Sequence, residues 1–225
     1  MPSAVVIAVD GPSGSGKSTV ARGVAHALRL RYLDTGAMYR AVTWAVLDRG
    51  IDPADTEAVA ALAAEAELGI GTDAAHPTMA IYGTDVTAEV RSEPVTATVS
   101  IVSAIPEVRA TMVRRQQAVI GDGGIVVEGR DIGTTVAPNA TLKIFLTADP
   151  AARAARRGRE VAGASADART LASTEEDLLR RDAADAGRAA SPLRQAPDAV
   201  VIDATSLTAD EVVRRILNLL TPVTP

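Results

Sequence analysis

The chain has 225 residues, 47% of them hydrophobic and none of them cysteine, so it can bury a core as a single domain but has no disulfide, thiolate zinc site or cysteine nucleophile. Its 23 basic and 28 acidic residues give a net charge of −5, and only 2% of residues are aromatic, so no nucleic-acid partner is expected. No run approaches the roughly 18 apolar residues of a membrane span, and residues 1–4 lack the basic start of a secretion signal. We therefore expect a cytoplasmic protein without a membrane partner.

The first apolar run, Val5–Val9, leads into the glycine-rich loop Gly11-Pro12-Ser13-Gly14-Ser15-Gly16-Lys17-Ser18, and a helical pattern follows from Ser18 to about Leu30. This order and the G-x-x-x-x-G-K-S spacing are typical of a phosphate-binding loop. Glycines let backbone N–H groups surround phosphate oxygens, Lys17 adds charge, and Ser18 is expected to bind Mg²⁺. We expect residues 11–19, including Thr19, to hold a nucleoside triphosphate, although such a loop by itself names no reaction.

The next segments are shorter and more varied. Arg31–Asp34 occupies the place of a second strand, and helices are expected at Gly36–Arg49 and at the alanine-rich Thr56–Leu68. Between residues 68 and 90, apolar positions alternate and Tyr82-Gly83-Thr84 gives a turn signal. This stretch predicts a small antiparallel insert.

The second half alternates between helices and strands. We expect helices at Pro106–Val119, at Pro150–Leu179 with a break near Val161–Ser165, and at the amphipathic Ala209–Leu220. Strands are expected at Ile125–Val127, Leu142–Leu146 and Ala199–Ile202. Strands separated by helices predict an α/β fold, with a parallel sheet covered by helices.

A second group of residues suits another phosphorylated substrate, because guanidinium groups match phosphates and carboxylates. These residues fall at four places: Arg40 after the second strand position; Ser100 and Arg109 around the start of the 106–119 helix; Arg130-Asp131 after the strand ending at Glu128-Gly129; and Arg181, Asp185 and Arg188 on one helical face. Ligands of open α/β sheets bind at the carboxyl ends of strands, which favours the third place. For the fourth place, surface ion pairing is an open alternative.

At these residues the chain resembles the bacterial cytidylate (CMP) kinase family, a group of P-loop nucleoside monophosphate kinases. The matching segments are Ile7–Gly14 with Gly16-Lys17-Ser18, Leu33–Arg40, Glu128–Thr134, Lys143–Leu146, and Arg181-Asp182 with Asp185 and Arg188. The resemblance implies ATP- and Mg²⁺-dependent phosphorylation of CMP and dCMP by a monomer. It also implies a single kinase domain, 1–225, with an acceptor-binding insert at about 51–105 and a helical lid at about 151–175.

The resemblance assigns roles to matching positions. Arg40 and Arg130 would bind the acceptor phosphate, while Ser100, Arg109 and Asp131 would read the cytosine edge. A carboxylate at Asp131 suits an exocyclic amine, which donates, and repels the carbonyl that uracil presents there. The other residues expected at the acceptor are Thr35, Tyr39, Arg181, Asp185 and Arg188.

Two positions differ from many relatives but keep the chemical group. Thr35 stands where many have serine, and adds a methyl group near the sugar or base. Glu128 stands where some have aspartate, and is expected to meet Mg²⁺ through water, since this ion keeps much of its hydration shell.

Charge on the transferring phosphoryl group is expected to be stabilised by Lys17, Arg130 and three arginines after Pro150. Arg153, Arg156 and Arg157 are spaced to share one face of a helix that could close over ATP. Spacing alone favours a solvated helix face, and only the family resemblance favours a catalytic role; Arg159 is assigned to the surface.

Three other functions are open to a chain with such a loop. Another small-acceptor P-loop kinase, such as a UMP/CMP, adenylate or shikimate kinase, would differ at Ser100, Arg109 and Asp131. A GTPase would need an N-K-x-D motif, but neither Asn139 nor Asn218 is followed by lysine. A non-catalytic nucleotide-binding switch would leave the second set of arginines without a purpose.

Overall fold

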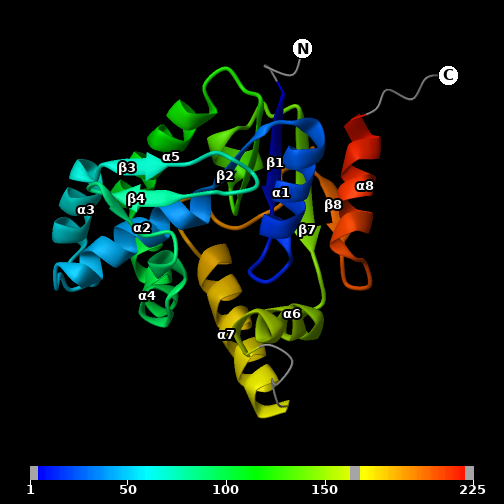
Figure 1. The fold of residues 1–225 in the computed structure, drawn as a ribbon. Coiled ribbons are helices and arrows are strands. Elements are labelled where there is room, and N and C mark those ends of the chain that lie inside the picture. Colours follow the sequence, from blue (N-terminus) through cyan, green and yellow to red (C-terminus); the bar gives the residue numbers. More distant parts are fainter. Residues whose placement is uncertain (1–4, 163–167, 221–225) are drawn as a thin grey trace.

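The computed structural model describes residues 5–162 and 168–220, and a five-stranded parallel sheet forms its centre (Figure 1). The strand order is β2-β6-β1-β7-β8. The strands are β1 (Val6–Asp10), β2 (Arg31–Asp34), β6 (Ile125–Gly129), β7 (Leu142–Thr147) and β8 (Val200–Asp203). The α/β class and all five predicted strand positions are confirmed.

Eight α-helices are described within these ranges, along with two short turns of other helical types. The helices are α1 (Lys17–Leu28), α2 (Thr35–Asp48), α3 (Thr56–Glu65), α4 (Glu93–Ala104), α5 (Pro106–Ile120), α6 (Pro150–Ala162), α7 (Ala168–Ala186) and α8 (Ala209–Leu220). The turns are the 3₁₀ turn η1 (Glu89–Arg91) and the π-helical turn η2 (Ile132–Val136). The break was predicted near residues 161–165. The first two of these residues end α6, and residues 163–165 lie outside the described residues.

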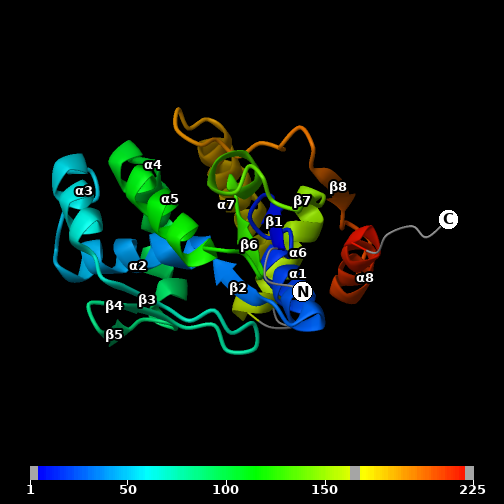
Figure 2. The same cartoon turned by 90° about the horizontal axis from the view of Figure 1, so that it is seen from above.

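Helices cover both faces of the sheet because alternate strand residues are buried on opposite sides. Ile7 and Val9 pack in a core cluster with residues of α1 and α8, whereas Ala8 belongs to a second cluster built largely from α2 to α5. β1 is buried on both faces, which explains why its sequence is continuously apolar. In Figure 2, the α3–α4 side of the molecule and α8 lie at opposite ends of the sheet.

The predicted antiparallel insert is confirmed as the three-stranded sheet β3-β4-β5, made of Leu68–Ile70, Met79–Ile81 and Thr84–Asp85. The helix predicted to run to Leu68 ends at Glu65, because Leu68 pairs with Ile81 in this sheet. Helix α4 was not predicted. Its many valine, threonine and isoleucine residues have low helix propensity, and burial of its apolar face provides the stability that propensity does not.

The register of the parallel strands gathers acidic residues at one edge of the sheet. Asp34 at the end of β2 lies opposite Glu128 of β6, and Asp10 at the end of β1 lies opposite Gly129. Helices α6 and α7 lie beyond this carboxyl edge in Figure 1. The site is therefore expected where the sheet, α6 and α7 meet.

An ion pair with a lysine connects the segment between α7 and β8 to the sheet. Lys143 of β7 is buried, and its Nζ donates to both carboxylate oxygens of Asp198, at 2.8 and 2.9 Å. Among the described residues, no helix combines the length and apolar character needed to cross a bilayer.

Candidate active site

The phosphate-binding loop turns sharply between β1 and α1. Gly11 has φ +153°, and a Cβ atom there would lie only 2.0 Å from the carbonyl oxygen of Leu146, so no other residue fits this close approach. Gly16 precedes α1 in a left-handed conformation. The loop therefore directs the positive end of the helix dipole toward any anion that it encloses.

Lys17 lies in this loop and is almost fully buried. Its Nζ donates to the carbonyl oxygen of Pro12 at 2.8 Å. Burial, with the nearby Arg130 guanidinium, lowers the pKa of Lys17 to about 7, although Glu128 and Asp10 oppose the shift. Without an anion, the charged form of Lys17 is therefore destabilised by burial and by Arg130, and a bound phosphate would stabilise it.

Ser18 and Glu128 form an oxygen site beside the loop. The Ser18 hydroxyl donates to Glu128 Oε2 at 3.0 Å, and the Tyr32 hydroxyl donates to Glu128 Oε1. Burial and the neighbouring Asp34 raise the pKa of the Glu128 carboxyl. A hydroxyl and carboxylates suit Mg²⁺, which binds oxygen through few protein ligands. Among the described residues, no group of three or more histidine, aspartate or glutamate side chains is placed to hold a metal ion.

A buried ion pair lies at the other end of the site. Arg109 Nη2 donates to Asp131 Oδ2 at 2.6 Å and Nη1 to the carbonyl oxygen of Ser103 at 3.2 Å, and both charged side chains are at most 6% exposed. The Arg109 guanidinium also lies over the Tyr39 ring. Burial raises the pKa of Tyr39 to about 12. Asp131 is thus held through its Oδ2, while its Oδ1 accepts no hydrogen bond from the part of the chain that the structure describes.

Asp10 fixes the backbone that follows Asp131. Its two carboxylate oxygens accept hydrogen bonds from the N–H groups of Ile132, at 2.8 Å, and Gly133, at 2.7 Å. Burial raises the pKa of Asp10 to about 6, even though these two N–H groups act in the opposite direction. This side chain therefore connects the end of β1, where the phosphate loop begins, to the turn η2.

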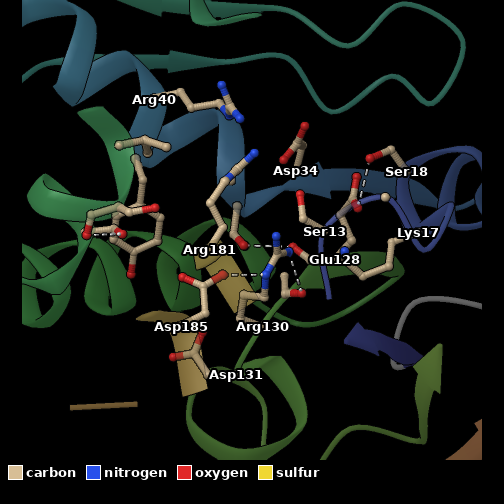
Figure 3. A pocket seen from close by; sticks show the side chains of 18 of the residues that line it. Ser13, Lys17, Ser18, Asp34, Arg40, Glu128, Arg130, Asp131, Arg181 and Asp185 are labelled. Carbon is tan, nitrogen blue, oxygen red and sulfur yellow. Dashed lines mark hydrogen bonds and ion pairs between the residues drawn. The ribbon is translucent and has the colours of Figure 1, made fainter. Parts of the chain in front are cut away.

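One carboxylate, that of Asp185, contacts two of the arginines in the middle of the site. Arg130 Nε donates to Asp185 Oδ2 at 2.9 Å, and Arg188 Nη1 lies 3.5 Å from Asp185 Oδ1. Burial and the positive charge of Arg181 and other neighbours lower the pKa of Arg40 to about 9. Figure 3 shows Arg40, Arg130 and Arg181 facing the Ser13–Ser18 segment across the cavity.

Most of these groups line one cavity. Among its lining residues, eight are lysine or arginine and four are aspartate or glutamate, an excess of positive charge that favours polyanionic ligands. The eight basic residues are Lys17, Arg40, Arg91, Arg109, Arg130, Arg157, Arg181 and Arg188. The cavity thus runs from the phosphate loop to the Arg109–Asp131 pair without interruption.

A second, less polar cavity adjoins the back of the loop. Gly14, Ser15, Gly16 and Thr19 line one side, and Leu207, Ala209 and Val212 contribute apolar surface from the segment around the start of α8. Arg156 and Arg159 complete the wall. Gly14, Gly16 and Thr19 line both cavities, so the second cavity suits the uncharged part of a ligand whose phosphates lie in the loop.

Comparison with known proteins identifies the family. A family model described as cytidylate kinase matches residues 7–222. The chain belongs to the cytidylate kinase family. It is 53% identical over 218 residues to the cytidylate kinase of Streptomyces avermitilis, covering 96% of this chain and 92% of the relative, and 48% identical over 221 residues to that of Mycolicibacterium paratuberculosis, covering 97% and 96%.

A solved structure shares the fold at much lower sequence similarity. The structure of an uncharacterized protein from Eubacterium ventriosum superposes with a TM-score of 0.51 at 13% identity, covering 96% of this chain and 98% of the other. At this identity the likeness concerns the fold alone. Membership of the cytidylate kinase family rests on the family model and the sequence relatives.

The cavity brings together most of the residues expected from the sequence. Ser13, Gly14 and Gly16 to Thr19 line it on the donor side. On the acceptor side it is lined by Thr35, Tyr39, Arg40, Ser100, Arg109, Arg130, Asp131, Arg181, Asp185 and Arg188, with Glu128 between the two. The hydroxyl of Thr35 donates to the Glu128 carbonyl oxygen at 2.7 Å, so one of its bonds is used within the protein.

The three arginines after Pro150 contact different parts of the site. Arg153 is buried against the phosphate loop, where its Nη1 donates to the carbonyl oxygen of Ser13 at 3.0 Å. Arg156 donates to the carbonyl oxygen of Ala204 and lines the second cavity, while Arg157 lines the first. Arg159, assigned to the surface from the sequence, lines the second cavity.

Sequence reasoning missed several lining residues. Arg91 of η1 lines the first cavity, and its Nη2 donates to Asp34 Oδ2 at 2.6 Å. Asp34 also accepts from the Ala37 N–H at 2.9 Å and so caps α2. No short motif contains both partners of the Arg91–Asp34 pair, since 57 residues separate them.

Proposed function

We propose that this chain transfers the γ-phosphoryl group of ATP to CMP and dCMP, giving ADP with CDP or dCDP. The observation that carries this proposal is the single cavity that joins the phosphate loop to the Arg109–Asp131 pair in a member of the cytidylate kinase family. The donor phosphates would lie at one end of the cavity and the carboxylate that reads cytosine at the other. The acceptor phosphate would then lie between them. This is the arrangement that direct transfer requires.

Each ligand part is assigned to a set of described residues. The backbone of residues 11–19 would hold the ATP phosphates, and the second cavity would take its nucleoside. Arg40 and Arg130 would bind the acceptor phosphate, and Asp131 Oδ1 would accept the exocyclic amine of cytosine. The hydrogen bond from Arg109 to Asp131 Oδ2 supports this assignment, because it orients the carboxylate and balances its charge.

The acceptor itself supplies the nucleophile. An oxygen of the acceptor phosphate attacks the γ-phosphorus of ATP while the bond to the β,γ-bridging oxygen breaks, and ADP leaves with that electron pair. A phosphate monoester is largely a dianion at pH 7, since its second pKa is about 6, so no side chain has to remove a proton. Catalysis then consists of alignment and charge stabilisation, for which we propose Lys17, Arg130 and Arg157.

Mg²⁺ bound with ATP would neutralise phosphate charge and fix the orientation of the chain of phosphates. Ser18 is the residue proposed to bind it directly, and Glu128 the residue proposed to hold it through water. Arg156 is placed to contact the donor nucleotide from the second cavity. Arg153 is proposed to contribute through the loop backbone rather than by touching the transferring group.

We further propose that the enzyme works as a monomer in the cytoplasm, with an acceptor-binding insert at about 51–105 and a lid at about 151–175. The monomer proposal is supported by one chain lining both cavities. Residues 163–167 of the lid range lie outside the described residues. Sedimentation velocity with and without both substrates would test the monomer.

The function is tested by measuring Mg²⁺-dependent ADP formation from ATP with CMP, dCMP, UMP, AMP, GMP and shikimate as acceptors. Turnover led by CMP and dCMP is the expected result. Equal or faster use of UMP, AMP or shikimate would show that the acceptor end of the cavity has been assigned wrongly. Measuring the nucleotide diphosphate product beside ADP separates transfer from simple ATP hydrolysis.

A further inference from the structure

Helix α7 contacts both ends of the proposed active site through two carboxylates on the same side of the helix. Asp185 accepts a hydrogen bond from Arg130 Nε at 2.9 Å, at the end of β6. One turn earlier, Asp182 Oδ1 accepts from the backbone N–H of Ser13 at 3.1 Å, in the phosphate loop. Arg181, next to Asp182 in the sequence, lines the same cavity. One helix therefore carries acceptor-side residues and a direct contact to the donor loop.

The contact at Ser13 involves both sides of its backbone. Asp182 accepts from the Ser13 N–H, and Arg153 Nη1 donates both to the Ser13 carbonyl oxygen at 3.0 Å and to Asp182 Oδ2. Arg153 is itself anchored by its Nε, which donates to the carbonyl oxygen of Ala148 at 3.1 Å. The two charged side chains are 6% and 16% exposed, so water screens them little.

The neighbouring glycine shows how closely the helices approach the loop. A Cβ atom on Gly14 would lie 3.2 Å from the carbonyl oxygen of Arg153 in α6 and 3.4 Å from Leu178 Cδ1 in α7. The loop is thus packed directly against both helices. A change in the position of α7 must then be accommodated by Ser13 and Gly14, because packed interfaces of this kind do not deform continuously.

We propose that Asp182 is a positioning residue that couples binding of the acceptor nucleotide to binding of ATP. This inference rests on the proposed function. An acceptor that contacts Arg181 and the Asp185–Arg130 pair holds α7 in one position, and α7 then holds the Ser13 peptide through Asp182. By thermodynamic reciprocity, ATP in the loop must favour acceptor binding by the same factor.

Asp182→Asn is the variant that tests the coupling. Asparagine keeps an oxygen for the Ser13 N–H but loses the charge that binds Arg153, and charge-assisted hydrogen bonds are roughly twice as strong as neutral ones. The measurement is the Kd of the Mg²⁺ complex of a non-hydrolysable ATP analogue, with and without saturating CMP. We expect CMP to lower this Kd at least about fivefold in the wild type, the lower end of typical coupling factors, and to have little effect in Asp182→Asn.

Asp177→Asn provides a matched control on the same helix. Asp177 pairs with Arg180 at 2.7 Å in an exposed ion pair, with both side chains more than 60% exposed, and it touches neither cavity. This variant should retain the wild-type coupling factor. If it loses coupling as much as Asp182→Asn does, the effect belongs to the charge of α7 in general and the proposal is wrong.

A second variant covers the case in which Asp182→Asn does not fold. Arg153→Lys keeps a positive charge for Asp182, but one ammonium group cannot reach Ala148, Ser13 and Asp182 as the guanidinium does. We expect reduced coupling here as well, with cooperative urea unfolding retained. Wild-type coupling in either folded variant, or no coupling in the wild type, would overturn the inference. Turnover of CMP by the wild type, measured on the same preparation, tests the proposed function separately.

Discussion

Asp131→Asn is the sharpest test of how the acceptor base is read. The change keeps the size of the side chain and an oxygen that can accept from Arg109, so the bond at 2.6 Å has a neutral replacement. The free oxygen proposed to accept the cytosine amine becomes an amide N–H₂ when the other oxygen stays on Arg109. The variant then offers a donor where the wild type offers an acceptor.

The expected magnitude follows from the bond that is lost. A hydrogen bond to a charged group contributes about 1.5–3 kcal/mol, so kcat/KM for CMP should fall by about 10- to 150-fold. UMP, whose carbonyl can accept from the new amide, should lose much less or improve. The assay is kcat/KM for CMP and UMP under identical Mg²⁺ and ATP, and its readout is the ratio of the two. An unchanged ratio would refute the assignment of Asp131 to base reading.

Stability has to be separated from recognition in this experiment. Removing one partner of a buried ion pair typically destabilises a protein by about 3–5 kcal/mol, and the asparagine should reduce this by keeping one hydrogen bond. The double variant Arg109→Gln/Asp131→Asn leaves no unpaired charge and should unfold at higher urea than Asp131→Asn. If the double variant also recovers CMP activity, the single variant failed through misfolding and the argument from base reading is wrong.

Three further predictions concern the donor side and the framework. The pKa of Lys17 is lowered to about 7 in the free protein, so raising the pH from 7 to 9 deprotonates its amine. Phosphates favour the charged form of this amine. Binding of an ATP analogue at pH 8 should therefore be accompanied by proton uptake, which is measured by calorimetry in buffers of different ionisation enthalpy. No proton uptake would contradict this. Glu128→Gln should raise the Mg²⁺ concentration for half-maximal rate by about 10-fold, and an unchanged requirement would count against its role. Asp10→Asn turns an N–H group toward the N–H of Ile132 or Gly133 and should lower the free energy of unfolding by about 1–3 kcal/mol in urea titrations; equal stability would show that these bonds are dispensable.

Local chemistry explains what could be predicted from the sequence. The phosphate loop was recognisable because its glycines and Lys17 act within a few residues of one another, and the strand ends because continuous apolar runs mark buried strands. Family resemblance, not spacing, brought Arg109 and Asp131 to the same site, since they lie in different elements 22 residues apart.

Tertiary contacts explain what could not be predicted. Helix α4 is stabilised by packing against its neighbours in spite of its β-branched residues, so propensity misleads there. Arg91 sits in a three-residue turn that has no periodic pattern. The directions of Arg153, Arg156 and Arg157 depend on the loop and on Ala204, which belong to other parts of the chain.

The small number of lysines in this chain makes its side-chain amines selective targets for chemical labelling. Arginine carries almost all of the positive charge, and Lys17 and Lys143 are the only lysines. Lys143 is occupied by the Asp198 carboxylate, whereas Lys17 faces the cavity with its pKa lowered to about 7. An acylating reagent shaped to enter the nucleotide cavity therefore meets one neutral side-chain amine near physiological pH. The enzyme could be covalently labelled at its donor site, and bound ATP should protect it.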